Sequence, residues 1–127
     1  MQAEIFHQNL EEEFYTEEKC YITELSQDWG LGSSSIARAR VEPGVTTNWH
    51  ILKETTERYH ILQGKGRVEV GDLEAEEIGV GDTVVIPAEC PQRISNIGEE
   101  DLIFLAICTP PFDEFNYEDV EDIKTDK

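Results

Sequence analysis

The fold is decided within residues 49–66, which read WHILKETTERYHILQGKG. β-Branched and aromatic residues fill both halves of this segment, as is typical of strands, and a short polar stretch separates them. In the second half Glu57, Tyr59 and Ile61 lie two residues apart, so they share one face of an extended strand. The segment therefore predicts two strands, the second of which carries a carboxyl group and a phenol on one face.

The two histidines of this segment are predicted to play different parts. If the face of Glu57 points into the interior, His50 can converge on it from the neighbouring strand. A neutral imidazole and a carboxylate begin a site for a divalent first-row metal ion, although such a site needs at least one further ligand. His60 lies on the other face of its strand, where we expect sheet surface or a contact between subunits.

Short β-rich segments continue on both sides of this pair, and turn residues separate them. We expect a hairpin turn of type I′ at Gly71–Asp72 and an end to the sheet region at Pro110–Pro111. About eight to ten short strands at this spacing predict an all-β sandwich or barrel. The expected strands cover residues 20–25, 35–42, 46–52, 57–63, 83–87, 91–96 and 101–108, with the hairpin over 64–79.

The chain of 127 residues has a formal net charge of -18, and acidic residues gather at its ends. This charge argues against nucleic acid and anionic membrane surfaces as partners, because both attract Lys and Arg. We expect one domain with an acidic N-terminal extension over 1–18, a barrel over 19–112 and an acidic C-terminal tail over 113–127. Residues 8–18 and 113–123 are each expected to form a short helix.

The cysteines indicate a reducing compartment. Cys20, Cys90 and Cys108 are odd in number and have no CxxC spacing, which argues against a secreted disulfide scaffold. The N-terminal sequence lacks the basic and apolar regions of a signal peptide, and no apolar run approaches the ~18 residues of a membrane span. We therefore expect a cytoplasmic protein.

Two spaced patterns in the body resemble those of the cupin family. The first pattern is glycine, five residues, His-x-His, three or four residues, glutamate, six residues, glycine. Gly44, His50, Glu57 and Gly64 stand at these positions, and Leu52 takes the place of the second histidine. The first pattern is therefore complete except for one ligand position.

The second cupin pattern is glycine, five residues, Pro-x-Gly, two residues, histidine, three residues, asparagine. Gly81, Pro87 and Asn96 match it, whereas Glu89 replaces glycine and Gln92 replaces histidine. The resemblance covers about residues 34–108. It implies a small antiparallel jelly-roll barrel, usually a homodimer.

The resemblance also implies a metal site, because a typical cupin holds its metal with three histidines and one glutamate. Here His50, Glu57 and Gln92 would remain as a sparse, weakly binding site for Zn, Mn, Fe or Ni, completed by water or substrate. The alternative is that the metal has been lost and that these three side chains hydrogen-bond a ligand or ordered water.

Other polar and aromatic side chains have two possible places. Tyr59 either donates a hydrogen bond in the pocket or is a core tyrosine with a satisfied hydroxyl. Arg38 and Arg40 share a strand face, from which they either bind a carboxylate or phosphate or pair with acidic residues outside the barrel. In the acidic tail, Phe112 and Tyr117 are among the aromatic residues that could dock back on the barrel or close over its mouth.

The cupin resemblance leaves two classes of function open. The first is an enzyme that acts on a small oxygenated substrate, such as a sugar derivative or an organic acid, as an isomerase, epimerase or dioxygenase. Its catalytic candidates are Glu57, His50 and Tyr59, and burial of Glu57 beside apolar neighbours is expected to raise its pKa. The second class is a metal-free, non-catalytic module that binds a small molecule in the barrel.

Overall fold

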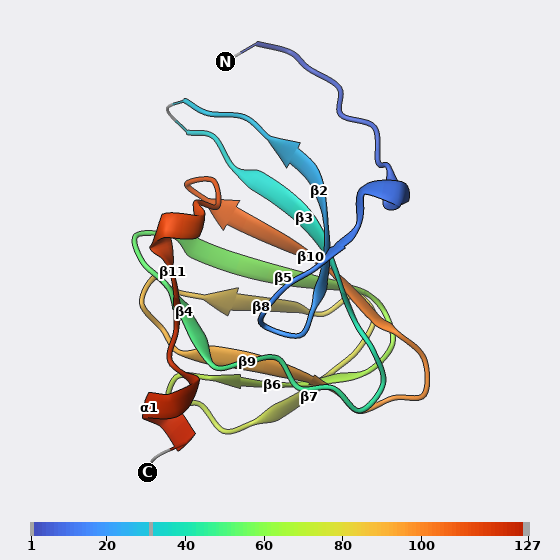
Figure 1. Cartoon of the computed structure of the whole chain (residues 1–127), viewed down its shortest axis with the longest axis vertical. Helices are drawn as coiled ribbons and strands as arrows, with labels where there is room; N and C mark the ends of the chain where they lie inside the picture. The colour runs from blue at the N-terminus through green and yellow to red at the C-terminus, as the bar shows by residue number, and fades with distance from the viewer. Residues whose placement is uncertain (1, 31, 126–127) are drawn as a thin grey trace.

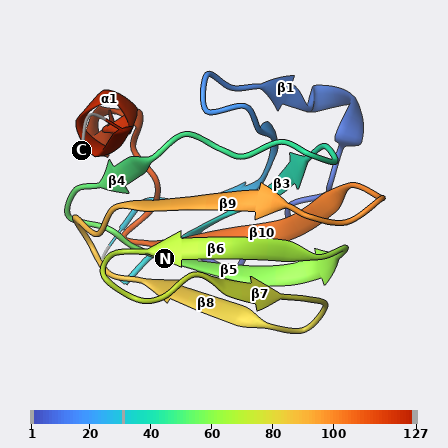
Figure 2. The same ribbon diagram turned by 90° about the horizontal axis from the view of Figure 1, so that it is seen from below.

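A computed structural model describes residues 2–30 and 32–125 of the chain as two antiparallel sheets that face each other (Figure 1, Figure 2). The larger sheet has the strand order β1-β2-β3-β10-β5-β8, and the smaller sheet has the order β11-β4-β9-β6-β7. From β3 onward the chain crosses between the sheets at every step except the β6–β7 hairpin. This arrangement confirms the predicted all-β, antiparallel jelly-roll fold.

Most elements are short, and the strands account for the body of the molecule. The strands are β1 (Phe14–Tyr15), β2 (Tyr21–Gln27), β3 (Ser35–Val41), β4 (His50–Leu52), β5 (Thr56–Gln63), β6 (Gly66–Val70), β7 (Glu76–Ile78), β8 (Thr83–Ile86), β9 (Gln92–Asn96), β10 (Leu102–Thr109) and β11 (Tyr117–Asp119). The helical turns are η1 (Leu10–Glu12), η2 (Glu114–Asn116) and α1 (Glu121–Thr125). No helix within the described part of the chain is long and apolar enough to cross a membrane.

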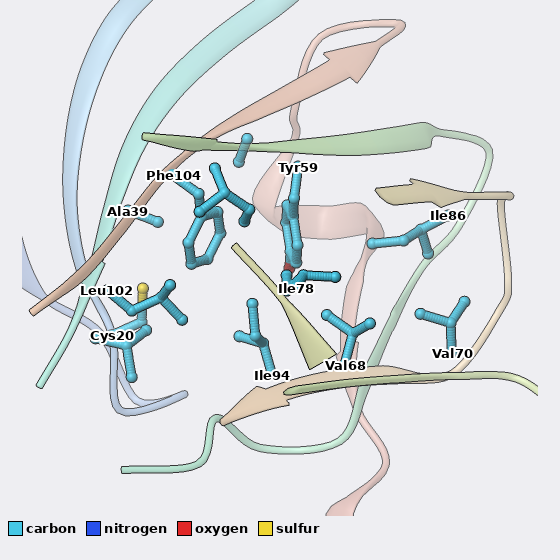
Figure 3. Close-up of a cluster of buried hydrophobic side chains, with 13 residues drawn as sticks. Cys20, Ala39, Tyr59, Val68, Val70, Ile78, Ile86, Ile94, Leu102 and Phe104 are labelled. Atoms are coloured by element: carbon cyan, nitrogen blue, oxygen red, sulfur yellow. The ribbon is translucent and has the colours of Figure 1, made fainter. Parts of the chain in front are cut away.

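Alternate residues of both sheets fill the space between them with apolar side chains (Figure 3). In β10, Leu102, Phe104, Ala106 and Cys108 are buried, and the residues between them are half-buried on the outer face. The smaller sheet contributes Val68, Val70, Ile78 and Ile94 to the same core. This packing follows from the period of two in the sequence, because each strand buries one face.

The predicted faces of β5 are confirmed. Glu57, Tyr59 and Ile61 are buried, whereas Arg58 and Leu62 are exposed. The carboxyl group of Glu57 therefore points into a largely apolar interior. Such a group needs hydrogen-bond partners there, because burial without them is costly.

The two predicted terminal helices are wrong. Residues 8–18 form only the turn η1 and the strand β1, and residues 113–123 form η2, β11 and the first residues of α1. The side chains of Asn9 and Asp113 each accept a hydrogen bond from the backbone N–H two residues later, which favours an isolated turn over a longer helix. The flanking residues then gain strand pairing with β2 and β4.

Two predictions about turns need correction. β10 ends at Thr109, before Pro110–Pro111, but the chain then returns to the smaller sheet as β11, so the sheet region continues. The turn at Gly71–Asp72 is present, and the backbone N–H of Leu73 donates to the carbonyl oxygen of Val70 at 3.1 Å. Only Gly71 of its two central residues has a positive φ, so the turn is not of type I′.

Two residues of the cupin patterns have structural roles. Gly64 has a φ of 87°, and a Cβ atom there would lie 2.9 Å from the carbonyl oxygen of Asp101, so this position requires glycine. The buried side-chain amide of Asn96 donates to the carbonyl oxygens of Val41 and Glu100, both at 2.8 Å. Both residues hold connections between the sheets and contribute nothing directly to a site.

Candidate functional site

A cavity of about 110 Å³ lies against the inner face of the larger sheet, between β1, β2, β3, β5 and β10. A smaller hollow of about 40 Å³ adjoins it and reaches β4 and β11 of the other sheet. We call the two together the inner pocket. They share five lining residues, Glu18, Ile22, Glu57, Ala106 and Phe112.

Glu57 lies at the junction of the two hollows and is held by a chain of buried hydrogen bonds. The hydroxyl of Tyr59 donates to Oε1 of Gln92 at 2.7 Å, and Nε2 of Gln92 donates to Oε1 of Glu57 at 2.7 Å. The thiol of Cys108 donates to Oε2 of Glu57 at 3.6 Å, a weaker contact. Strand pairing builds this cluster, because Glu57 lies opposite Cys108 between β5 and β10.

Burial is the main influence on the acidity of Glu57, and it raises the pKa of the carboxyl group. A charge on His50 and the hydrogen bond from Gln92 act in the opposite direction, and the nearby carboxylate of Glu18 raises the pKa further. This direction agrees with the expectation from the sequence. The carboxyl group is thus favoured as a proton carrier over a permanent anion.

His50 faces Glu57 from the smaller sheet and is fixed from three sides. Its Nδ1 lies 2.8 Å from the carbonyl oxygen of Asn48, which can only accept, so Nδ1 carries the proton. Nε2 then holds the lone pair and can accept a proton or a hydrogen bond. Oε2 of Glu18 lies 3.4 Å from Nδ1, and the ring of Tyr117 stacks on the imidazole with centroids 5.1 Å apart.

The C-terminal strand β11 places Tyr117 against the inner pocket by pairing with β4. Among the described residues the Tyr117 hydroxyl is buried and has no hydrogen-bond partner. Burial raises its pKa, so the phenol stays protonated and can donate. An unpartnered buried hydroxyl is costly, and a ligand oxygen in the pocket would satisfy it.

Several residues singled out from the sequence lie away from the pocket. Arg40 binds Glu13 and Asp101 on the outer face of the larger sheet, and Arg38 lies 3.5 Å from Glu13. His60 contacts the Thr83 hydroxyl at 2.9 Å on the same outer face. The arginine pair therefore takes the second of its two possible places, pairing with acidic residues outside the barrel.

Sequence reasoning missed Cys108 and Glu18, which contact Glu57 and His50 in the inner pocket. Cys108 could have been placed there, because it has the same strand parity as Phe104 in β10. Glu18 carried no such signal, since it ends a run of acidic residues that resembles a solvated surface. Its position beside His50 depends on the turn that leads from β1 into β2.

Comparison with known sequences identifies the family. A family model described as Cupin domain matches residues 37–108, which is more than half of the chain. The chain belongs to the cupin family. One curated relative of this cupin is the uncharacterized protein MJ1618 of Methanocaldococcus jannaschii, which is 38% identical over 87 residues. That match covers 68% of this chain and 66% of the relative, so the chain spans just under two thirds of the relative's length.

Solved structures share the fold of this cupin over most of its length. Pac13, a nucleoside dehydratase of Streptomyces, superposes with a TM-score of 0.74 at 18% sequence identity and covers 91% of each chain. KdgF from Halomonas sp. superposes with a TM-score of 0.76 at 16% identity, covering 90% of this chain and 99% of the other. At these identities the likeness shows the fold alone.

The donor set of this cupin does not fit the metal site that the family pattern implies. Gln92 directs its amide nitrogen, which cannot ligate a cation, toward Glu57, and its oxygen already accepts from Tyr59. Leu52, at the position of the second histidine, is buried and apolar. Within the described residues no three His, Cys, Asp or Glu side chains gather closely enough to hold an ion. Of the three side chains that the family pattern places here, His50 and Glu57 are left as strong ligands for a metal ion.

Proposed function

We propose that this cupin binds a small oxygenated molecule in the inner pocket and transfers a proton on it without a metal ion. The observation that carries the proposal is the buried carboxyl group of Glu57, which is oriented by Gln92 and faces His50. An acid and a base in one pocket is the arrangement needed for isomerase- or epimerase-type chemistry. A dioxygenase would need the metal site that the donor set does not fit.

The two side chains have complementary roles in this proposal. The lone pair of His50 Nε2 takes a proton from a carbon next to a carbonyl group, and protonated Glu57 gives its proton to the carbonyl oxygen, which leaves an enol. Glu18 lies 3.4 Å from Nδ1 and stabilises the imidazolium that forms. The imidazolium then returns its proton to the other carbon or face while the Glu57 carboxylate takes a proton back from the enol hydroxyl group, so there is no net gain or loss of protons.

Tyr59 acts as a positioning residue in this scheme. Its hydroxyl is committed to Gln92, so it fixes the amide whose nitrogen holds Glu57. Tyr117 is the better candidate for direct ligand contact, because its hydroxyl is buried and unpartnered among the described residues. The ligand expected from the sequence, a sugar derivative or an organic acid, would offer carbonyl and hydroxyl oxygens to these groups.

The second candidate function is a binding module without catalysis. The fully hydrogen-bonded state of Glu57 favours it, because a carboxyl group with both oxygens engaged can serve simply to orient a bound molecule. The two functions use the same pocket and differ in whether a proton moves.

Solvent deuterium exchange separates the two functions. Sugar derivatives and organic acids that bind by calorimetry are incubated with the protein in D₂O, and loss of their C–H signals is followed by NMR. We expect exchange with the wild-type protein and a loss of about 100-fold or more in Glu57→Gln and in His50→Ala. Glu77→Gln, an exposed site on β7, is the matched control. Binding without exchange would establish the binding module, and absence of binding would contradict both functions.

A metal titration tests the alternative ligand set His50, Glu57 and Gln92. The amide of Gln92 reaches Glu57 at 2.7 Å, so an imidazole at position 92 would face the same space. We expect Gln92→His to bind Zn at least tenfold more tightly than the wild-type protein in calorimetry. Stoichiometric, tight metal in the wild-type protein that is lost in His50→Ala would contradict the metal-free proposal.

A further inference from the structure

A second hollow lies directly outside the inner pocket. It has a volume of about 300 Å³ and is bordered by the end of β2, the loop that follows it and the segment around η2. We call it the outer groove. Two of the aromatic side chains that border it, Trp29 and Phe115, are 64% and 87% exposed. Exposed aromatic faces at the mouth of a pocket can stack on a ring of a ligand.

Phe112 separates the outer groove from the inner pocket. It borders the cavity, the adjoining hollow and the outer groove. Its backbone is tethered on both sides, since its N–H donates to Oγ of Ser35 at 2.8 Å and its carbonyl oxygen accepts from Nε2 of Gln27 at 3.1 Å. Glu24 also borders both the cavity and the groove, so the two spaces lie on either side of these two side chains.

The ionisable side chains along this path are mostly carboxyl groups. The outer groove has carboxyl groups at Glu24, Asp113 and Glu114, and the inner pocket has them at Glu18 and Glu57. Among the described residues, none of these linings includes a lysine or an arginine. A phosphate or carboxylate on the ligand would lose its hydration and find no lysine or arginine partner, which is costly.

The inner pocket alone is small. Its cavity of about 110 Å³ and the adjoining hollow of about 40 Å³ together come to about the 150 Å³ of a cavity that holds benzene in an engineered protein. One small ring, or part of one, fills such a space. A ligand with a second ring would extend past Phe112 into the outer groove.

We propose that the outer groove is a second subsite that stacks an uncharged ring between Trp29 and Phe115, while the other ring of the same ligand enters the inner pocket past Phe112. The ligand class is therefore a neutral molecule of two linked rings, such as a glycoside or a nucleoside, and anionic sugars and nucleotides are excluded. This inference rests on the proposed function, because it uses the inner pocket as the site of the first ring.

Calorimetry with matched probes tests the subsite. The probes are methyl glycosides of common pentoses and hexoses, the corresponding phenyl glycosides, phenyl glucuronide, uridine and uridine 5′-monophosphate. We expect at least one phenyl glycoside or uridine to bind about fivefold to tenfold more tightly than any one-ring probe. The glucuronide and the monophosphate should each bind at least tenfold more weakly than their neutral partners.

Two variants locate the gain in affinity. The double variant Trp29→Ala/Phe115→Ala should lower the affinity for the two-ring probe to that of the one-ring probe and leave the one-ring probe unchanged. Leu73→Ala, at an exposed residue in the β6–β7 loop, is the control and should change neither affinity. Phe112→Ala should alter the ratio between one-ring and two-ring affinities.

The outcomes separate this inference from the function on which it rests. If one-ring probes bind and two-ring probes gain nothing, or if the double variant keeps the gain, the subsite is wrong and the inner pocket stands. Anionic probes that bind as tightly as their neutral partners overturn the charge argument. If no probe binds, both the subsite and the proposed function fail.

Discussion

Glu57 couples the stability of the protein to pH, because its pKa is raised by burial in the folded state. In the unfolded chain a glutamate ionises near its usual pKa of about 4.3. Above that pH the unfolded state releases a proton that the folded state still holds, so this group lowers stability as pH rises through the interval up to the folded pKa. Glutamine at position 57 cannot ionise and removes this effect.

We therefore expect the free energy of unfolding of Glu57→Gln, relative to wild type, to increase as the pH rises above about 4.3. Denaturant unfolding at several pH values measures it. For Glu77→Gln, at an exposed site, the free energy of unfolding relative to wild type should not change with pH over the same range. If the free energy of unfolding of Glu57→Gln relative to wild type were also independent of pH, the carboxyl group would ionise as easily in the folded protein as in water.

At the residue scale, strand parity was enough to place the side chains of the central strands. It put Glu57 and Tyr59 inside and His60 outside, and the structure agrees. Parity could not show that Gln92 presents its nitrogen to Glu57, because side-chain torsion and the competing hydroxyl of Tyr59 decide that. The choice between metal ligand and hydrogen-bond donor therefore lay beyond the sequence.

β11 is the element that joins the C-terminal segment to the site. It pairs with β4, and Val120 after it is buried with its N–H donating to the carbonyl oxygen of Trp49. β4 has only one residue pair with β9, His50 opposite Gln92, so β11 supplies most of its pairing. The position of His50 therefore depends on β11.

We expect truncation after Asn116 to lower the free energy of unfolding by about 3 kcal/mol, because Tyr117 and Val120 lose their burial. The midpoint of thermal unfolding should fall by about 10 °C. Truncation after Glu121 is the control, since it keeps β11 and the carboxylate that accepts from the backbone N–H of Trp49. Equal midpoints for the two truncations would mean that β11 contributes no stability.

At the element scale, the strands of the body could be predicted and the two terminal strands could not. β5 and β10 have eight residues each with a clear alternation, and both were expected. β1 and β11 have two and three residues, too few to show a period, and they exist because a partner strand is available. Neither terminal segment shows an alternation of apolar and polar residues, so the sequence carries no sign of these two strands.

The outer face of the larger sheet carries apolar side chains that have no covering element in the described chain. Half-buried Ile103, Leu105 and Ile107 of β10 run along its centre, and exposed Leu62 and Val85 lie on the neighbouring strands. The positive charge of Arg40 on this face is already balanced by Glu13 and Asp101. Such a surface is suited to a contact between two copies of the chain.

We expect the protein to form a homodimer through this face, in competition with the repulsion between two chains that each carry a formal net charge of -18. Leu105→Arg adds a charge at the centre of the face and should weaken the dimer at least tenfold, whereas Leu73→Arg, at an exposed site in the β6–β7 loop, should leave it intact. Light scattering coupled to size exclusion, repeated at low and high salt, measures both effects. Salt should strengthen the wild-type dimer because it screens the like charges. A monomer at every concentration and salt, or a dimer that Leu105→Arg does not weaken, would place any subunit contact elsewhere.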